Sequence, residues 1–170
     1  MDLKRHIRSV PNFPEPGIIF RDITPLLLNQ ESFRYCVDAF SERSRAISPD
    51  LIVGIESRGF IFGSALAYEM NLPFVPIRKP GKLPFAIEEI EYELEYGSDT
   101  LQIHSDALKP QQKVVLVDDL IATGGTLQAS RLLVEKMGAE VVGINSVIVL
   151  KEICPAEILR DEALFYLVDF

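Results

Sequence analysis

The chain has 170 residues, 48% hydrophobic and 25% charged, and this length most simply forms one domain spanning residues 1–170. Its formal net charge of −8 argues against a nucleic-acid-binding surface, and no apolar run is long enough to predict a membrane span. Only Cys36 and Cys154 are present, without metal-ligand spacing, so we expect a reduced, cytoplasmic protein.

The first 28 residues contain four prolines, which preclude a long helix and favour an extended path. Within this segment, residues 18–23 combine apolar side chains with one cation and one acid. The segment is either an arm packed on the body or a hood over a ligand. In the second case the ring of Phe20 would stack on a flat base while main-chain groups contact the edge of that base.

Residues 30–47 are predicted to form an amphipathic core helix, with Asn29 or Ser32 as its N-cap. The apolar run 51–55 predicts a buried strand, and the apolar run 60–70 predicts a second helix. Between them lies Arg58, whose planar guanidinium suits a phosphate or a pyrophosphate. The alternative is a surface ion pair between Arg58 and Glu56.

A short strand at 74–77 precedes a stretch with three cations and no acid, Arg78, Lys79 and Lys82. An acidic protein that binds an anionic ligand needs such a local concentration of positive charge. Pro80 and Gly81 predict a loop there, and hence a mobile lid over about residues 78–96. Residues 90–96 alternate as a strand, which we expect to pair with residues 101–104.

The most informative stretch is 114–126, in which four apolar residues lead into Asp118 and Asp119. Such a run predicts a strand buried on both faces, and ligands bind at the carboxyl ends of these strands. The loop that follows consists of Ala122, Thr123, Gly124, Gly125 and Thr126. It precedes a predicted helix, so its amides and hydroxyls are expected to bind a phosphate.

That helix is expected to bury Ala129, Leu132, Leu133 and Met137, to pair Arg131 with Glu135, and to stop at Gly138. A strand at 141–150, a short helix within 155–163 and a closing strand at 164–170 complete the chain. Because strands and helices alternate, we predict an α/β fold with a central, mainly parallel sheet flanked by helices. The N-terminal hood and a flexible β-flap are added to this core.

Residues 114–126 closely resemble the ribose-phosphate motif of the type I phosphoribosyltransferases. The resemblance extends to residues 13–27, 56–63, 77–84 and 94–97. The hood and the Leu-Glu-Tyr-Gly flap at 94–97 resemble those of the family members that act on adenine. One departure is the apolar lid tip at 85–87, where related enzymes often have more polar residues.

This resemblance implies transfer of the 5-phosphoribosyl group from phosphoribosyl pyrophosphate to adenine, giving AMP and pyrophosphate in purine salvage. It also implies Mg²⁺, bound through the pyrophosphate and the ribose rather than directly by the protein, and a homodimer. By this resemblance, the loop that binds the 5′-phosphate consists of Ala122, Thr123, Gly124, Gly125 and Thr126, and the ribose hydroxyls are bound by Asp118 and Asp119. The pyrophosphate is contacted by Arg58, Arg78, Lys79 and Lys82. The adenine pocket is formed by Ile19, Phe20 and Arg21, and the flap carries Glu95 and Tyr96.

Two questions stay open at the level of sequence. The proton of the base could be taken by Glu95 or by Asp119. The base could also be guanine or hypoxanthine, or the chain could be a regulator that binds phosphoribosyl pyrophosphate without turnover. Such a regulator would need a nucleic-acid-binding surface, which the negative charge disfavours.

Overall fold

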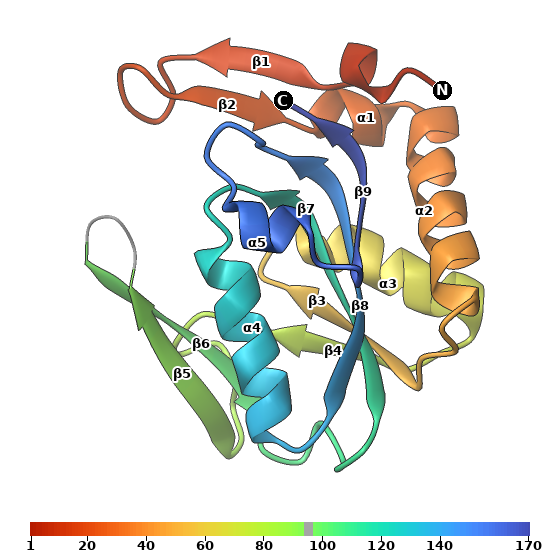
Figure 1. The fold of residues 1–170 in the computed structure, drawn as a ribbon, viewed down its shortest axis with the longest axis vertical. Coiled ribbons are helices and arrows are strands. Elements are labelled where there is room, and N and C mark those ends of the chain that lie inside the picture. Colours follow the sequence, from red (N-terminus) through yellow and green to blue (C-terminus); the bar gives the residue numbers. More distant parts are fainter. Residues whose placement is uncertain (94–96) are drawn as a thin grey trace.

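The computed structural model describes residues 1–93 and 97–170. Its centre is a five-stranded sheet in the order β4-β3-β7-β8-β9, with every neighbouring pair parallel (Figure 1). The strands are β3 (Leu51–Ile55), β4 (Phe74–Ile77), β7 (Lys113–Ile121), β8 (Glu140–Val149) and β9 (Leu164–Asp169). The predicted α/β class with a central parallel sheet is therefore confirmed.

Both faces of this sheet are covered, which explains why its strands are apolar without alternation. On β7, Val115 and Val117 belong to the core shared with α2 (Gln30–Arg45) and α3 (Gly59–Met70). Val114 and Leu116 point to the opposite core, beneath α4 (Gly125–Lys136). All four valine and leucine side chains are fully buried.

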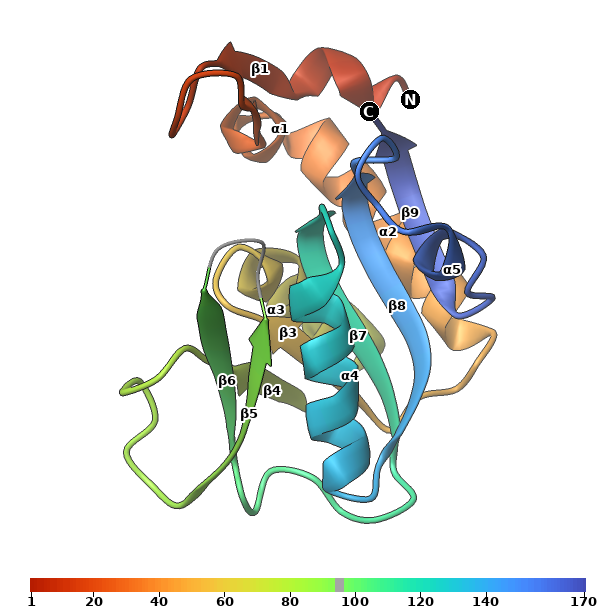
Figure 2. The ribbon, with the colours of Figure 1, turned by 60° about the vertical axis from the view of Figure 1, so that its left-hand side comes forward.

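A separate antiparallel hairpin lies beside α4, made of β5 (Ile87–Glu93) and β6 (Ser98–His104) (Figures 1 and 2). It is joined to the edge of the central sheet because the main chains of Arg78 and Gln102 exchange two hydrogen bonds, each of 2.8 Å. The predicted hairpin is present, but its predicted register is wrong, because residues 101–104 pair with 87–90 and residues 98–101 pair with 90–93.

The N-terminal segment comprises a 3₁₀ turn (Leu3–His6), the antiparallel pair β1 (Arg8–Pro11) and β2 (Ile19–Asp22), and α1 (Thr24–Leu28). Figure 2 shows this segment above the carboxyl ends of the central strands. Its buried side chains, Leu3, Ile7, Ile23 and Leu26, join the core of α2 and α3. In the described ranges, no helix has the length and apolar character needed to cross a bilayer.

Two details of the helices were predicted correctly. The Asn29 side chain caps α2 by accepting a hydrogen bond of 2.9 Å from the Ser32 amide. Gly138, just beyond α4, has a φ of +81°, as expected for a residue that ends a helix in the left-handed conformation.

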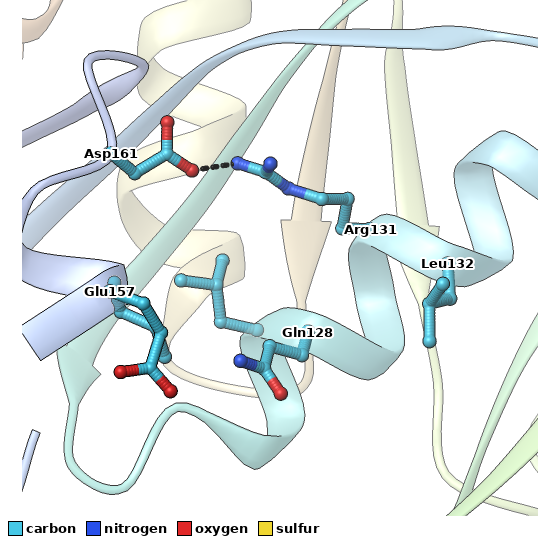
Figure 3. A pocket seen from close by; sticks show the side chains of 7 residues that line it. Gln128, Arg131, Leu132, Glu157 and Asp161 are labelled. Atoms are coloured by element: carbon cyan, nitrogen blue, oxygen red, sulfur yellow. Dashed lines mark hydrogen bonds and ion pairs between the residues drawn. The ribbon is translucent and has the colours of Figure 1, made fainter. Parts of the chain in front are cut away.

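Two details of α4 were predicted wrongly. Leu132 is 53% exposed, and Arg131 pairs with Asp161 instead of Glu135 (Figure 3). The reason is tertiary, because the turn after α5 (Ala156–Leu159) brings Asp161 beside α4. The buried face of α4 is consequently formed by Leu127, Ala129, Ser130, Leu133 and Val134.

Candidate active site

Asp118 and Asp119 lie inside β7 rather than after it. On one side, β7 stays paired with β8 as far as Ile121. On the other side, its pairing with β3 ends at Val117, because β3 ends at Ile55. The two carboxylates therefore begin where β7 loses one neighbour, and Asp118 lines a hollow, the crevice, at this carboxyl edge of the sheet.

The amino end of α3 closes one side of this crevice. A Cβ atom on Gly59, the first residue of α3, would lie 2.6 Å from the Val117 carbonyl oxygen and 3.0 Å from Asp118 Oδ1. Only glycine permits this approach. Arg58, immediately before Gly59, is thereby held next to the two carboxylates.

The acidic pair is partly neutralised by Arg58, whose Nε lies 3.0 Å from Asp119 Oδ2. Within the described residues, that oxygen is buried and has no well-aligned hydrogen-bond donor. Burial raises the pKa of Asp118 well above its usual value, and the charge of Asp119 raises it further. Burial also raises the pKa of Asp119, although the Arg58 charge opposes this.

The loop 122–126 surrounds a hollow of about 110 Å³, which Asp118 also lines. Gly124 has a φ of +81°, and a Cβ atom there would lie 2.0 Å from Ile158 Cδ1 on α5. Gly124 is therefore required both by its conformation and by its contact with α5. The free amides and the positive end of the α4 dipole lie at this hollow, so it can bind an anion.

Two of the three cations within residues 78–82 are paired with acids from other parts of the chain. Glu56 Oε2 accepts hydrogen bonds from Arg78 Nε at 3.1 Å and from the Lys79 amide at 2.6 Å. The ammonium group of Lys79 forms an ion pair with Asp99, while Lys82 is exposed. The alternative of a surface ion pair between Arg58 and Glu56 does not hold, because these two side chains have other partners.

These contacts shift the pKa values of the partners. Burial is the largest influence on Glu56 and raises its pKa, but the hydrogen bonds from Lys79 and Arg78 outweigh it, so the pKa is lowered. For Lys79, burial lowers the pKa, but the hydrogen bonds to Asp99 and Tyr92 outweigh burial, so the pKa is raised. Both side chains are therefore charged at neutral pH.

The hood residues divide between two sides of β2. The ring centroid of Phe20 lies 5.1 Å from the Arg58 guanidinium carbon and 5.2 Å from the Phe13 ring centroid. Ile19 and Arg21 point to the other side by strand alternation. There the Arg21 guanidinium carbon lies 3.9 Å from the centroid of the Phe170 ring, beside a pocket of about 310 Å³.

Glu95 and Tyr96, predicted for the flap, lie outside the described residues. Sequence reasoning missed Asp99 as the partner of Lys79 and assigned Glu56 only to Arg58. A signal for Glu56 existed, since it follows directly after an apolar run in the same way that Asp118 follows Val117. Asp99 gave no such signal, because its contact with Lys79 depends on the register of β5 and β6.

Comparisons with known proteins agree with this geometry. The family model described as the phosphoribosyl transferase domain matches residues 23–163. An adenine phosphoribosyltransferase of Crocosphaera subtropica is 54% identical over 172 residues, which cover 100% of both chains. The crystal structure of the adenine phosphoribosyltransferase of Thermoanaerobacter pseudethanolicus matches with a TM-score of 0.94 at 44% identity, covering 99% of this chain and 98% of that one.

A third match is the adenine phosphoribosyl transferase of Trypanosoma brucei, solved in complex with AMP, pyrophosphate and ribose-5-phosphate. Its TM-score is 0.88 at 28% identity, and the match covers 98% of this chain and 77% of that one.

The chain belongs to the phosphoribosyltransferase family, whose domain model matches residues 23–163, and its parallel sheet with an acidic pair and a small-residue loop at the carboxyl edge fits that class. Within the family it groups with the adenine phosphoribosyltransferases, which it matches over its full length.

Proposed function

We propose that the chain transfers the 5-phosphoribosyl group from phosphoribosyl pyrophosphate to adenine, releasing pyrophosphate and forming AMP, a step of purine salvage. The observation that carries this proposal is the order of sites along the crevice. An anion hollow at 122–126 adjoins the Asp118–Asp119 pair, and Arg58 lies on the other side of Asp119. This order matches a substrate with a phosphate, a diol and a pyrophosphate in succession. The ligands in the Trypanosoma brucei relative support it.

The loop residues Ala122, Thr123, Gly124, Gly125 and Thr126 would bind the 5′-phosphate through their amides and hydroxyls. Asp118 and Asp119 would accept hydrogen bonds from the ribose hydroxyls. Their negative charge also stabilises the positive charge that develops on the ribose as the bond to pyrophosphate breaks. Because Asp119 is buried and Asp118 is half-buried, their charge acts at a lower effective dielectric than in water.

Arg58, Arg78, Lys79 and Lys82 would contact the pyrophosphate and stabilise the charge that grows on it as it leaves. Among the described residues, no three His, Cys, Asp or Glu side chains form a ready-made metal site. The acidic pair fits an Mg²⁺ ion carried by the substrate, because Mg²⁺ favours phosphate oxygens and water with few carboxylates. When bound, Mg²⁺ would neutralise charge on the pyrophosphate.

Phe20 would stack on the adenine ring, with Ile19 and Arg21 completing the pocket through main-chain contacts. The proton of the base would go to Glu95 or to Asp119. The raised pKa of Asp119 favours proton uptake, while its contact with Arg58 opposes it. Glu95→Gln should slow the single-turnover rate much more than it weakens substrate binding if Glu95 is the acceptor, whereas Asp119→Asn should do so in the other case.

We further propose that residues 78–96 close as a lid that excludes water, a competing nucleophile. We expect one domain over residues 1–170 and a cytoplasmic location.

A homodimer is supported by the outer side of α3, where Ile61 is 37% exposed and Tyr68 is 90% exposed. Sedimentation velocity on the wild type and on Tyr68→Glu tests this, since a monomer in both would contradict it.

The test of function is pyrophosphate release from phosphoribosyl pyrophosphate and Mg²⁺, with adenine, hypoxanthine, guanine and orotate offered separately. Turnover with adenine alone is the expected result. Turnover with another base would support phosphoribosyl transfer but contradict the proposed adenine pocket. Tight binding without turnover of any base would favour the regulator, the second candidate.

A further inference from the structure

The hydroxyl group of Tyr92 on β5 lies within hydrogen-bond distance of three side chains from different segments. It is 3.1 Å from Thr126 Oγ1, 3.2 Å from Lys79 Nζ and 3.3 Å from Asp99 Oδ2. Lys79 belongs to the lid, Asp99 to β6 and Thr126 to the anion-binding loop. One phenol oxygen therefore connects the two regions proposed to bind the two ends of the substrate.

The ring of Tyr92 is partly buried and packs against the core that contains the buried face of α4. A Cβ atom on Gly125 would lie 3.7 Å from Tyr92 Cδ2 and 3.7 Å from the Glu93 carbonyl oxygen, so β5 covers the first turn of α4 at ordinary contact distance. Lys79 Nζ also lies 5.7 Å from the centroid of the Tyr92 ring. Loss of the hydroxyl alone should therefore leave this packing intact.

The hydroxyl has one proton, so its bonds are linked. The Lys79 ammonium can only donate and the Asp99 carboxylate can only accept. When Tyr92 donates to Asp99, Thr126 must donate to Tyr92, and its proton is not available to a phosphate. When Tyr92 donates to Thr126, the proton of Thr126 is free to point into the hollow.

We propose that Tyr92 is a positioning residue, which sets the Thr126 hydroxyl for the 5′-phosphate and holds the Lys79 ammonium for the pyrophosphate. This proposal rests on the proposed function and adds a residue that acts through two others. Through Tyr92, the Thr126 hydroxyl at the hollow would be linked to Lys79 of the lid before any substrate binds.

The test compares Tyr92→Phe with Tyr35→Phe, a matched control on α2 that is 40% exposed. We expect Tyr92→Phe to raise the KM for phosphoribosyl pyrophosphate about tenfold, the scale of one hydrogen bond that serves a charged group. The KM for adenine and the thermal midpoint should stay at the wild-type values. Calorimetric titration with ribose 5-phosphate should show weaker binding to Tyr92→Phe than to Tyr35→Phe.

A double-mutant cycle with Thr126→Val tests whether Tyr92 acts through Thr126. The expected result is that Thr126→Val costs much less affinity for ribose 5-phosphate in the Tyr92→Phe background than in the wild type. Additive losses, an unchanged KM for phosphoribosyl pyrophosphate, or a parallel rise in both KM values with a lower thermal midpoint would each overturn the proposal. Absence of turnover by the wild type would instead refute the proposed function, and the titration would still test Tyr92.

Discussion

The guanidinium of Arg58 forms an ion pair with Asp119, at 3.0 Å between Nε and Oδ2, and it does so at the point where the sheet opens. The same group lies 5.1 Å from the ring of Phe20 in the hood. Arg58, just before α3, therefore contacts both β7 and β2, and it compensates the buried carboxylate of Asp119 next to the half-buried Asp118. We therefore expect loss of Arg58 to change the charge balance around Asp119 in addition to any contact with pyrophosphate.

Arg58→Ala should lower kcat/KM for phosphoribosyl pyrophosphate by at least about tenfold, the scale of one charge-assisted hydrogen bond. The Arg58 charge opposes the upward shift of the Asp119 pKa, so its removal raises that pKa further. The rise of kcat/KM with pH should then move to higher pH. Steady-state kinetics across pH measure both effects, with the exposed Arg34→Ala as control. An unchanged kcat/KM would refute the role of Arg58.

Asp118→Asn should stabilise the free protein while it impairs catalysis. The pKa of Asp118 is raised by burial, so the folded state binds this proton more tightly than the unfolded state. Asp118 therefore costs no stability below the pKa that it has in the unfolded state. The free energy of unfolding then falls as the pH rises from that value through the pKa of Asp118 in the folded state. Near neutral pH the substitution should add about 1–2 kcal/mol, or roughly 2–8 °C in the thermal midpoint.

Scanning calorimetry at acidic and neutral pH measures this gain, which should shrink on acidification because protonation removes the same buried charge. Asp38→Asn, at an exposed position on α2, should show no comparable gain. A lower midpoint for Asp118→Asn at neutral pH would contradict the predicted cost of burying the charge.

Gly124→Ala should destabilise the protein more than Gly81→Ala. The two glycines have similar φ angles of +81° and +76°, so the conformational cost of alanine is nearly the same. They differ in surroundings, because a Cβ atom at Gly124 would lie 2.0 Å from Ile158 Cδ1, whereas the space at Gly81 is open. We expect an extra loss of about 1–3 kcal/mol at Gly124.

Urea unfolding measures the difference, and Ile158→Val offers a rescue because it removes the Cδ1 atom. The double variant should recover part of the extra loss. Equal destabilisation of Gly124→Ala and Gly81→Ala would show that the contact with α5 relaxes at no cost.

Cys36 should be unreactive in the folded protein. Burial raises the pKa of its thiol to about 12, and Cys154, also buried, has a pKa raised by the same cause. Since the thiolate is the reactive form, a disulfide reagent near pH 8 should label neither residue in the native state and both in urea. Rapid labelling of one equivalent without denaturant would disprove this expectation.

The sequence by itself determined the elements of the fold and the chemical nature of the site. Uninterrupted apolar runs such as 114–117 predict strands buried on both faces, and this periodicity is a local property that survives in the structure. The acids and the small-residue loop that follow this apolar run are also contiguous in the chain. The hollow at 122–126 could therefore be predicted from one short segment.

Only the tertiary structure decided which charged groups are partners. Arg58 pairs with Asp119 on β7, Lys79 with Asp99 on β6, and Arg131 with Asp161 beyond α5. Local spacing predicted Glu135 for Arg131 and offered Glu56 as an alternative for Arg58, and neither pair forms. The register of strands and the packing of helices set these pairs, since charged side chains respond to distances in space that separation along the chain does not determine.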